Sequence, residues 1–225
     1  MRNVVVTGGS RGLGLGIARK LTAAGYRVIA IARKESNQLT SAMEEAERDG
    51  PGLLHFVPFD LAEIGEIRRL VTTLRKDFGP IYGLVNNAAI AFDGVLAIMH
   101  NSQIEHLVRV NTLSPIVLTK YIVRSMMADG GGRIVNVASV VGFTRSLARE
   151  VGRLGVTVNS VAPGFVDTAM TQNLDAEQRQ QIERRSALRR LPDVDDVANA
   201  VEFILSDKAK SITGTVITVD AGNTA

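Results

Sequence analysis

The sequence predicts a doubly wound α/β domain with a parallel sheet, on three observations. Short runs rich in β-branched residues alternate along the chain with longer amphipathic segments. These runs are apolar at consecutive positions, as strands buried on both faces of a parallel sheet must be. The 225 residues match one large α/β domain, and no linker or repeat divides them. Right-handed β-α-β crossovers then give a single domain, residues 1–225.

The alternation places seven strands and six helices. The strands are expected at Asn3–Thr7, Arg27–Ala32, Leu53–Phe59, Tyr82–Asn86, Arg133–Ser139, Val156–Ala162 and Thr215–Asp220. The helices are expected at Gly12–Ala24, Gln38–Arg48, Ile64–Asp77, Gln103–Ala128, Arg145–Gly152 and Asp195–Leu205. In the first helix Leu13, Ile17 and Leu21 form one apolar stripe. Gly25 follows at the position where positive φ ends a helix.

Composition excludes several kinds of function. The chain has no cysteine, which rules out disulfides and thiolate metal sites, and its three histidines lack ligand spacing, so no metal site is expected. The net charge is +3 with scattered arginines, which does not indicate a nucleic-acid partner. The apolar run Val4–Val6 is too short for a signal peptide or a membrane span, so we expect a cytoplasmic protein with no membrane partner.

A glycine-rich loop, Thr7–Gly14, closes the first strand and opens the first helix. Glycines let the backbone turn sharply and approach a pyrophosphate, while the helix N-terminus offers free N–H groups. The loop therefore predicts a Rossmann-type dinucleotide site, and a plain glycine turn is the alternative. Its candidate contacts are Gly8, Ser10, Arg11, Gly12, Leu13 and Gly14.

Two arginines indicate NADP(H) as the cofactor. The second strand ends at Arg33, where an NAD site would place an acidic residue to hold the ribose 2′-hydroxyl. Arg11 lies in the glycine-rich loop, and two guanidinium groups suit a 2′-phosphate. Alternatively, Arg33 is only a solvated residue at a strand end.

Together with further motifs, the loop resembles the short-chain dehydrogenase/reductases, and more narrowly the 3-oxoacyl-[acyl-carrier-protein] reductases, over nearly the whole chain. The motifs, in the family's order, are Thr7–Gly14, Phe59-Asp60-Leu61, Asn86-Asn87-Ala88-Ala89, Asn111, Ser139, Pro163-Gly164, Thr168, Asp196-Val197-Ala198, Ile212-Thr213-Gly214 and Val219–Gly222. The resemblance implies that Asp60 and Leu61 border the adenine and that Asn87 and Ala88 line the ribose side. Pro163, Gly164 and Thr168 would hold the nicotinamide end. In isolation Asn86–Ala89 is also consistent with a tight turn, and Pro163-Gly164 with a loop.

The catalytic set of the family is only half present. Family members reduce a ketone with a serine, a tyrosine and a lysine, supported by an asparagine; Ser139 and Asn111 match the first and the last. Alone, Ser139 is equally a helix cap and Asn111 a buried polar group. The Tyr-x-x-x-Lys pair is absent, because none of the three tyrosines has a lysine four residues further on.

The family's Tyr-x-x-x-Lys segment is missing at a single junction in the sequence. Ser139–Gly142 resembles the family's strand end and runs directly into Phe143–Glu150, which resembles the second half of the family's next helix. Either the natural protein has a segment that this chain lacks, such as one too mobile to be traced, or the deletion is genuine. We favour the first explanation because the flanks keep family character.

The stretch 168–190 is expected to be a substrate lid with five arginines. They suit an acidic acyl carrier protein or a CoA-like phosphate, or they form a solvated helix face. The resemblance implies NADPH-dependent reduction of a ketone, most simply a 3-oxoacyl thioester, by a homo-oligomer (dimer or tetramer). The alternatives are a catalytically inactive NADP(H)-binding protein or a scaffold subunit.

Overall fold

The computed structural model describes residues 1–92, 94–137, 140–166 and 175–225 of the chain. It contains one seven-stranded sheet, in which every adjacent pair is parallel and the order is β3-β2-β1-β4-β5-β6-β7. The strands are β1 (Asn3–Thr7), β2 (Arg27–Ala32), β3 (Leu53–Pro58), β4 (Ile81–Asn86), β5 (Gly132–Val137), β6 (Val156–Pro163) and β7 (Val216–Val219). This order confirms the predicted doubly wound α/β class, with strand ends shifted by at most two residues among those described.

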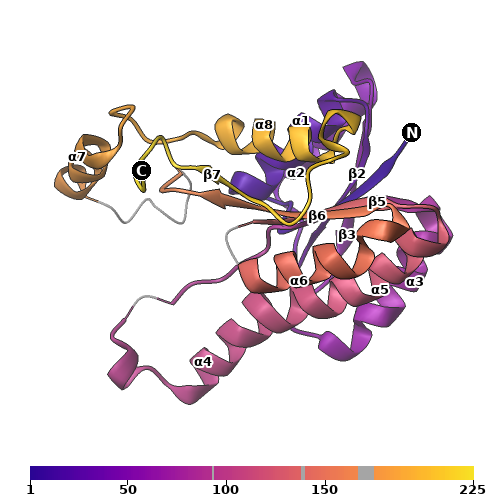
Figure 1. Cartoon of the computed structure of the whole chain (residues 1–225), viewed down its shortest axis with the longest axis horizontal. Coiled ribbons are helices and arrows are strands. Elements are labelled where there is room, and N and C mark those ends of the chain that lie inside the picture. Colours follow the sequence, from indigo (N-terminus) through magenta and orange to yellow (C-terminus); the bar gives the residue numbers. More distant parts are fainter. Residues whose placement is uncertain (93, 138–139, 167–174) are drawn as a thin grey trace.

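Helices cover both faces of the sheet (Figure 1). The helices are α1 (Gly12–Ala23), α2 (Asn37–Asp49), α3 (Ile67–Phe78), α4 (Asn101–Val108), α5 (Ser114–Ala128), α6 (Val141–Val151), α7 (Ala176–Arg185) and α8 (Val194–Leu205). One buried cluster packs α1, α2 and α8 against the sheet, and a second packs α3, α5 and α6 against its other face. In the described part of the chain, no helix has the length and hydropathy to cross a membrane.

Two predicted helices are divided in the structure. The helix expected at Gln103–Ala128 is α4 and α5 joined by a π-helical turn, η3 (Arg109–Leu113). Ile64–Glu66, expected as the start of α3, is a separate 3₁₀ turn, η1. Both differences are changes in hydrogen-bond register, which the spacing of apolar residues does not distinguish.

The β5–β6 crossover is short but closes. Helix α6 begins at Val141, four residues before the predicted start at Arg145, because it must follow β5 almost immediately. Its 11 residues span about 16 Å, enough to return along the sheet. Val140 precedes it at φ 59°, in the left-handed region that a β-branched residue adopts only under strain.

The chain is continuous in sequence over all 225 residues. The sheet closes across this short crossover, so the fold itself does not require the segment that carries the tyrosine and lysine in the family. That the natural protein has such a segment stays a prediction, which its intact mass tests.

Helices α1 and α8 pack so closely at Gly16 that a side chain there would require Val194 to shift. A Cβ at Gly16 would lie 2.1 Å from Val194 Cγ1, at the start of α8. We expect Gly16→Ala to lower the free energy of unfolding by about 1–3 kcal/mol, as overpacking typically does. Urea denaturation measures the difference.

Two matched variants test the cause. A Cβ added at Gly142 would meet no other atom within 4 Å, so Gly142→Ala should not destabilise the chain. Val194→Ala added to Gly16→Ala should recover part of the loss, because it removes the clashing methyl group. Equal stability of Gly16→Ala and the wild type would contradict the packing argument.

Candidate functional site

The candidate site lies at the carboxyl ends of the strands, where β1 and β4 are neighbours and their following helices leave to opposite faces of the sheet. Ligands of open α/β sheets bind at such a switch point. The structure brings to this edge the predicted residues Gly8, Ser10, Arg11, Gly12, Leu13, Gly14, Arg33, Asp60, Leu61, Asn87, Ala88, Pro163 and Gly164. Ser139 and Thr168, also predicted, lie outside the described residues.

Thr7 joins the end of β1 to the end of β4. Its buried hydroxyl accepts hydrogen bonds from the backbone N–H groups of Asn87 and Ala88, both at 3.0 Å. The same hydroxyl donates to the carbonyl of Val85 at 3.3 Å. The Asn87 amide donates in return to the Thr7 carbonyl at 3.0 Å. The glycine-rich loop and the segment after β4 are therefore held as one unit.

The glycine-rich loop has no room for side chains at its centre. Gly8 adopts φ +69°, and a Cβ there would lie 3.0 Å from the Cα of Ala88. A Cβ at Gly14 would lie 2.2 Å from the Gly8 carbonyl oxygen and 2.5 Å from Asn87 Nδ2. The loop backbone consequently packs directly against helix α1 and against Asn87, and its outer side is left for a ligand.

The N-terminus of α1 is arranged for an anion. Its N-cap, Arg11, has an extended backbone and makes no capping hydrogen bond with its side chain. The first turn contains no acidic residue. The first N–H groups of a helix have no intrahelical acceptor, and the helix dipole favours negative charge there. A pyrophosphate fits this position.

Arg11 and Arg33 supply positive charge beside this helix end. Both side chains are exposed, and neither forms an ion pair within the described residues. Gly8 fixes the loop to β2 by donating its N–H to the Ile31 carbonyl at 2.8 Å. The two guanidinium groups therefore extend from segments that are tied together.

A small internal pocket, with no room for a water molecule, lies behind the ends of β3 and β4. Leu61 and Ala88 line it together with Val110. Asp60, which precedes Leu61, accepts the N–H of Ala62 at 2.9 Å and so shapes the turn after β3. Asn86 Oδ1 and Ser114 Oγ also border the pocket, and both are buried with no hydrogen-bond partner in the part of the chain described.

Asn111 stands in the π-helical turn η3. Its amide donates to the Ile90 carbonyl at 2.8 Å and accepts the Ile90 N–H at 2.9 Å. Both ends of the side chain are thus used to fix the segment that follows β4. π-Helical turns of this kind are frequent at functional sites. The assignment of Asn111 to the catalytic set stays a prediction.

A buried polar network supports β5 and the shortened crossover. Asn86 donates through Nδ2 to Asn136 Oδ1 at 2.9 Å and to Thr119 Oγ1 at 3.0 Å. Asn136 donates to Thr144 Oγ1 of α6 at 2.8 Å. Burial makes such bonds costly to leave unformed, so the network fixes α6 against the sheet.

The end of β6 is packed against the C-terminal turn. A Cβ at Gly164 would lie 2.7 Å from Asp220 Cβ. The Asp220 carboxylate accepts the hydroxyl and the N–H of Thr224 and the N–H of Gly222. The hydrogen bond from the Thr224 hydroxyl, with these backbone N–H groups, lowers the pKa of Asp220 below its ordinary value. The Pro163-Gly164 turn is therefore supported from behind by an ionised side chain.

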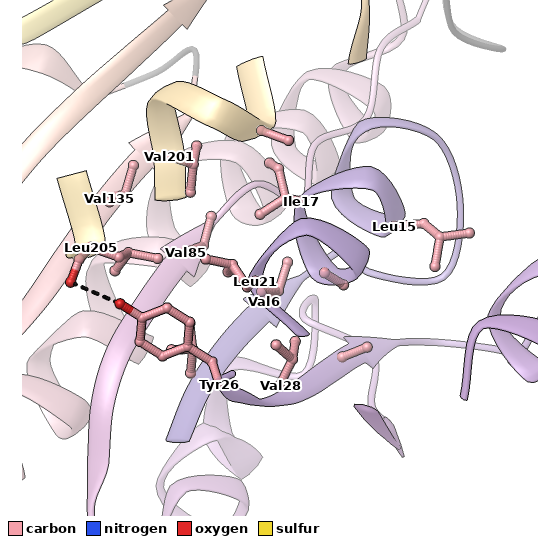
Figure 2. Close-up of a cluster of buried hydrophobic side chains, with 14 of the residues drawn as sticks. Val6, Leu15, Ile17, Leu21, Tyr26, Val28, Val85, Val135, Val201 and Leu205 are labelled. Atoms are coloured by element: carbon pink, nitrogen blue, oxygen red, sulfur yellow. Dashed lines mark hydrogen bonds between the residues drawn. The ribbon is translucent and has the colours of Figure 1, made fainter. Parts of the chain in front are cut away.

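No tyrosine reaches this edge of the sheet. Tyr26 and Tyr82 lie at the amino ends of β2 and β4, and both hydroxyls donate to the Leu205 carbonyl at the end of α8 (Figure 2 shows the bond from Tyr26). Burial raises the pKa of both tyrosines, so neither is a ready proton donor. Tyr121 lies within α5, with Lys120 Nζ 5.4 Å from its ring.

The described part of the predicted lid is helix α7, which has no buried residue and projects from the sheet in Figure 1. Arg179 pairs with Glu183 on the helix surface, and Arg190 pairs with Asp196 at 2.6 Å. These contacts favour a solvated helix face for part of the arginine set. Arg184 and Arg185 form no ion pair among the described residues.

Three supporting residues were missed as individual predictions. Thr7 was noted only as the first residue of its motif, and Asp220 only as part of the C-terminal motif. Ser36 was not singled out, although a serine directly before an amphipathic helix is a typical N-cap. Their hydrogen-bond partners are distant in sequence, so no local pattern identifies their roles at the site.

Comparison with known proteins agrees with this geometry. A family model described as short chain dehydrogenase matches residues 2–143, and one described as Enoyl-(Acyl carrier protein) reductase matches residues 138–224. The two matches meet at the shortened β5–β6 crossover.

One relative is the 3-oxoacyl-[acyl-carrier-protein] reductase of Escherichia coli, 36% identical over 97% of this chain and 95% of the relative. That alignment has 237 positions and contains about 218 residues of this chain, so about 19 positions stand opposite gaps in it. The relative therefore has about 19 more residues than this chain over the aligned region.

Solved structures share the whole architecture. A short chain dehydrogenase from Burkholderia cenocepacia in complex with NADP has a TM-score of 0.90 and 31% identity, over 100% of this chain and 98% of that one. A blue fluorescent protein from a metagenomic library in complex with NADPH has a TM-score of 0.91 and 29% identity, over 100% and 98%.

The Thr7 hydroxyl is open to a direct test. We expect Thr7→Val to lower the free energy of unfolding by about 1–3 kcal/mol, because two N–H groups lose their acceptor while the volume is kept. Thr7→Ser, which retains the hydroxyl, should lose much less. Thr72 bonds only to Arg68 on an exposed face, so Thr72→Val is the control and should change little. Urea denaturation distinguishes these outcomes, and equal losses for Thr7→Val and Thr72→Val would contradict the role of Thr7.

Proposed function

The chain belongs to the short-chain dehydrogenase/reductase family, and on that premise we propose that it binds NADP(H) and transfers hydride between this cofactor and a ketone. The observation that carries the proposal is the glycine-rich loop at the switch point, with a helix N-terminus that no side chain caps and two arginines beside it that form no ion pair with any residue the structure describes. The bound nicotinamide supplies the hydride.

The residues present fit this cofactor. Gly8 and Gly14 let the loop pack closely against α1, Asn87 and Ala88, and the first turn of α1 offers N–H groups to the pyrophosphate. Leu61 and Ala88, which the resemblance places beside the adenine and the ribose, follow the ends of β3 and β4 at this edge of the sheet. Pro163 and Gly164, held by the C-terminal turn, are placed by the resemblance at the nicotinamide end.

Preference for NADP(H) over NAD(H) is assigned to Arg11 and Arg33. Both are cations without a partner carboxylate in the described part of the chain, which is the environment that a 2′-phosphate requires. Two structural neighbours are complexes with NADP or NADPH, in agreement with this assignment.

The proposed substrate is a 3-oxoacyl thioester, on the basis of the relative from Escherichia coli. An acyl carrier protein is the proposed partner that presents it, and the arginines of the lid suit an acidic surface. We extend the proposal to a cytoplasmic homo-oligomer, a dimer or a tetramer.

Proton transfer is the weak step of this chain. In the proposed reaction Ser139 hydrogen-bonds the ketone oxygen, and Asn111 fixes the adjoining segment through Ile90. The proton that the family takes from its tyrosine has no side-chain donor in that role here, because all three tyrosines lie elsewhere. General acid catalysis contributes about 10²–10⁴-fold to a rate, so turnover is expected to be slow.

A second candidate function follows from the absence of the catalytic tyrosine. Without the tyrosine, the chain serves as an NADP(H)-binding protein or as a scaffold subunit of an assembly with an intact homologue. Complete loss of turnover, with cofactor binding retained, would favour this function.

The first measurement is the intact mass, followed by cofactor binding and turnover. A mass of 24.2 kDa establishes that the protein has the sequence given. We then expect NADPH to bind with micromolar affinity and a 3-oxoacyl thioester to be reduced about 10²–10⁴-fold more slowly than by a relative that has the Tyr-Lys pair. A chain that binds no NADPH would contradict the proposal, and turnover as fast as the relative's would contradict the assigned role of the missing tyrosine.

Arg33 provides a test of cofactor preference. Arg33→Ala should weaken NADPH binding about 10- to 100-fold, because it removes a charge-assisted contact to the 2′-phosphate. NADH lacks this phosphate, so its binding should stay nearly unchanged. Fluorescence titration with each cofactor measures this ratio. Arg68, exposed on α3, is the matched control, and Arg68→Ala should leave both affinities unchanged. Equal weakening of both cofactors by Arg33→Ala would contradict the assignment.

A further inference from the structure

Ser36 lies where three segments of the cofactor site meet. It follows the turn after β2, it is the N-cap of α2, and it contacts the glycine-rich loop. Its hydroxyl donates to the Ser10 carbonyl and accepts the N–H of Leu39 at 3.1 Å. One side chain therefore uses its single proton to join the loop after β1 to the turn after β2.

The bond from Ser36 connects the two segments that carry the unpaired arginines. Arg11 directly follows Ser10, and Arg33 lies three residues before Ser36. Both arginines are exposed, and no ion pair in the described parts of the chain fixes where their side chains extend. Fixing two backbone segments before binding reduces the entropy that a ligand bridging them must overcome.

The same turn controls the position of a carboxylate. Glu35 lies between Arg33 and Ser36 in the sequence. The Thr40 hydroxyl donates to the Glu35 Oε1 at 2.8 Å. Thr40 is in the first turn of α2, and its N–H donates to the Ser36 carbonyl at 3.0 Å. An acidic side chain near the end of the second strand is the residue type that holds a ribose 2′-hydroxyl and repels a 2′-phosphate. The contact with Thr40 holds Glu35 to α2.

We infer that Ser36 is a positioning residue for cofactor selectivity: by fixing the turn after β2 against the glycine-rich loop, it holds Arg11 and Arg33 together for the 2′-phosphate of NADP(H). The inference rests on the proposed function, since it concerns the same cofactor site. Ser36 itself bonds only to the protein and acts through the two arginines.

The test is a titration of the full chain with NADPH and with NADH, for the wild type and three Ser36 variants. Ser36→Ala and Ser36→Gly lose the donor to Ser10 and should lower the NADPH-over-NADH affinity ratio about 2- to 10-fold, the range of one hydrogen bond. Glycine is tolerated at an N-cap, so a loss shared by both variants does not come from a weakened helix. Ser36→Thr keeps the hydroxyl and should keep the ratio. A purely structural role would weaken both cofactors equally and leave the ratio unchanged, which would overturn the inference.

A double-mutant cycle with Arg33 sharpens the result. If Ser36 acts through Arg33, then Ser36→Ala should change the ratio less than 2-fold in an Arg33→Ala background. An undiminished effect in that background would overturn the inference. Selectivity that depends on Arg33 but not on Ser36 would overturn it also, while the proposed function stands. Failure of the wild type to bind NADPH would overturn both.

Discussion

The cofactor site depends on one hydroxyl group. Thr7 ends β1, and its side chain satisfies two backbone N–H groups that follow β4, 80 and 81 residues further along the chain. Parallel strands bring these segments together at the switch point, but the pairing of the strands stops at Val6 and Val85. Beyond that point the Thr7 hydroxyl takes the place of the next backbone hydrogen bonds between β1 and β4. The close contacts of Gly8 and Gly14 with the segment after β4 follow from this attachment.

The shortened crossover shows that the fold and the proposed proton transfer are separable in this architecture. The sheet is stabilised by two buried clusters on opposite faces, and α6 still contributes Leu147, Ala148 and Val151 to one of them. Thr144 adds a buried hydrogen bond to Asn136. The loss therefore falls on the loop and on the first turns of a helix, which carry function more than packing. Its visible structural cost is the left-handed conformation of Val140.

The two halves of the site differ in how much of the family's pattern they retain. Toward the pyrophosphate, the backbone, helix N-terminus and arginines form one connected set, joined by Thr7, Gly8 and Ser36. Toward the proposed ketone site, Asn111 fixes Ile90, while Tyr26 and Tyr82 are bonded to the end of α8 (Figure 2 shows Tyr26). The proposed binding of the cofactor and the proposed turnover of a ketone consequently depend on different parts of the chain.

The sequence by itself determined the fold class, the order of strands and helices, the glycine-rich loop, and the absence of a Tyr-Lys pair. Those features are local: a strand buried on both faces is apolar at every position, and a missing residue is missing in any conformation. Only the tertiary structure decided that Asn111 sits in a π-helical turn bonded to Ile90, and that Ser36 bonds to Ser10. It also decided where α6 begins, because a helix that must follow β5 at once starts where the chain can turn. The physical reason is that hydrogen-bond partners at the site come from different strands, and their distance is fixed by packing and not by spacing along the chain.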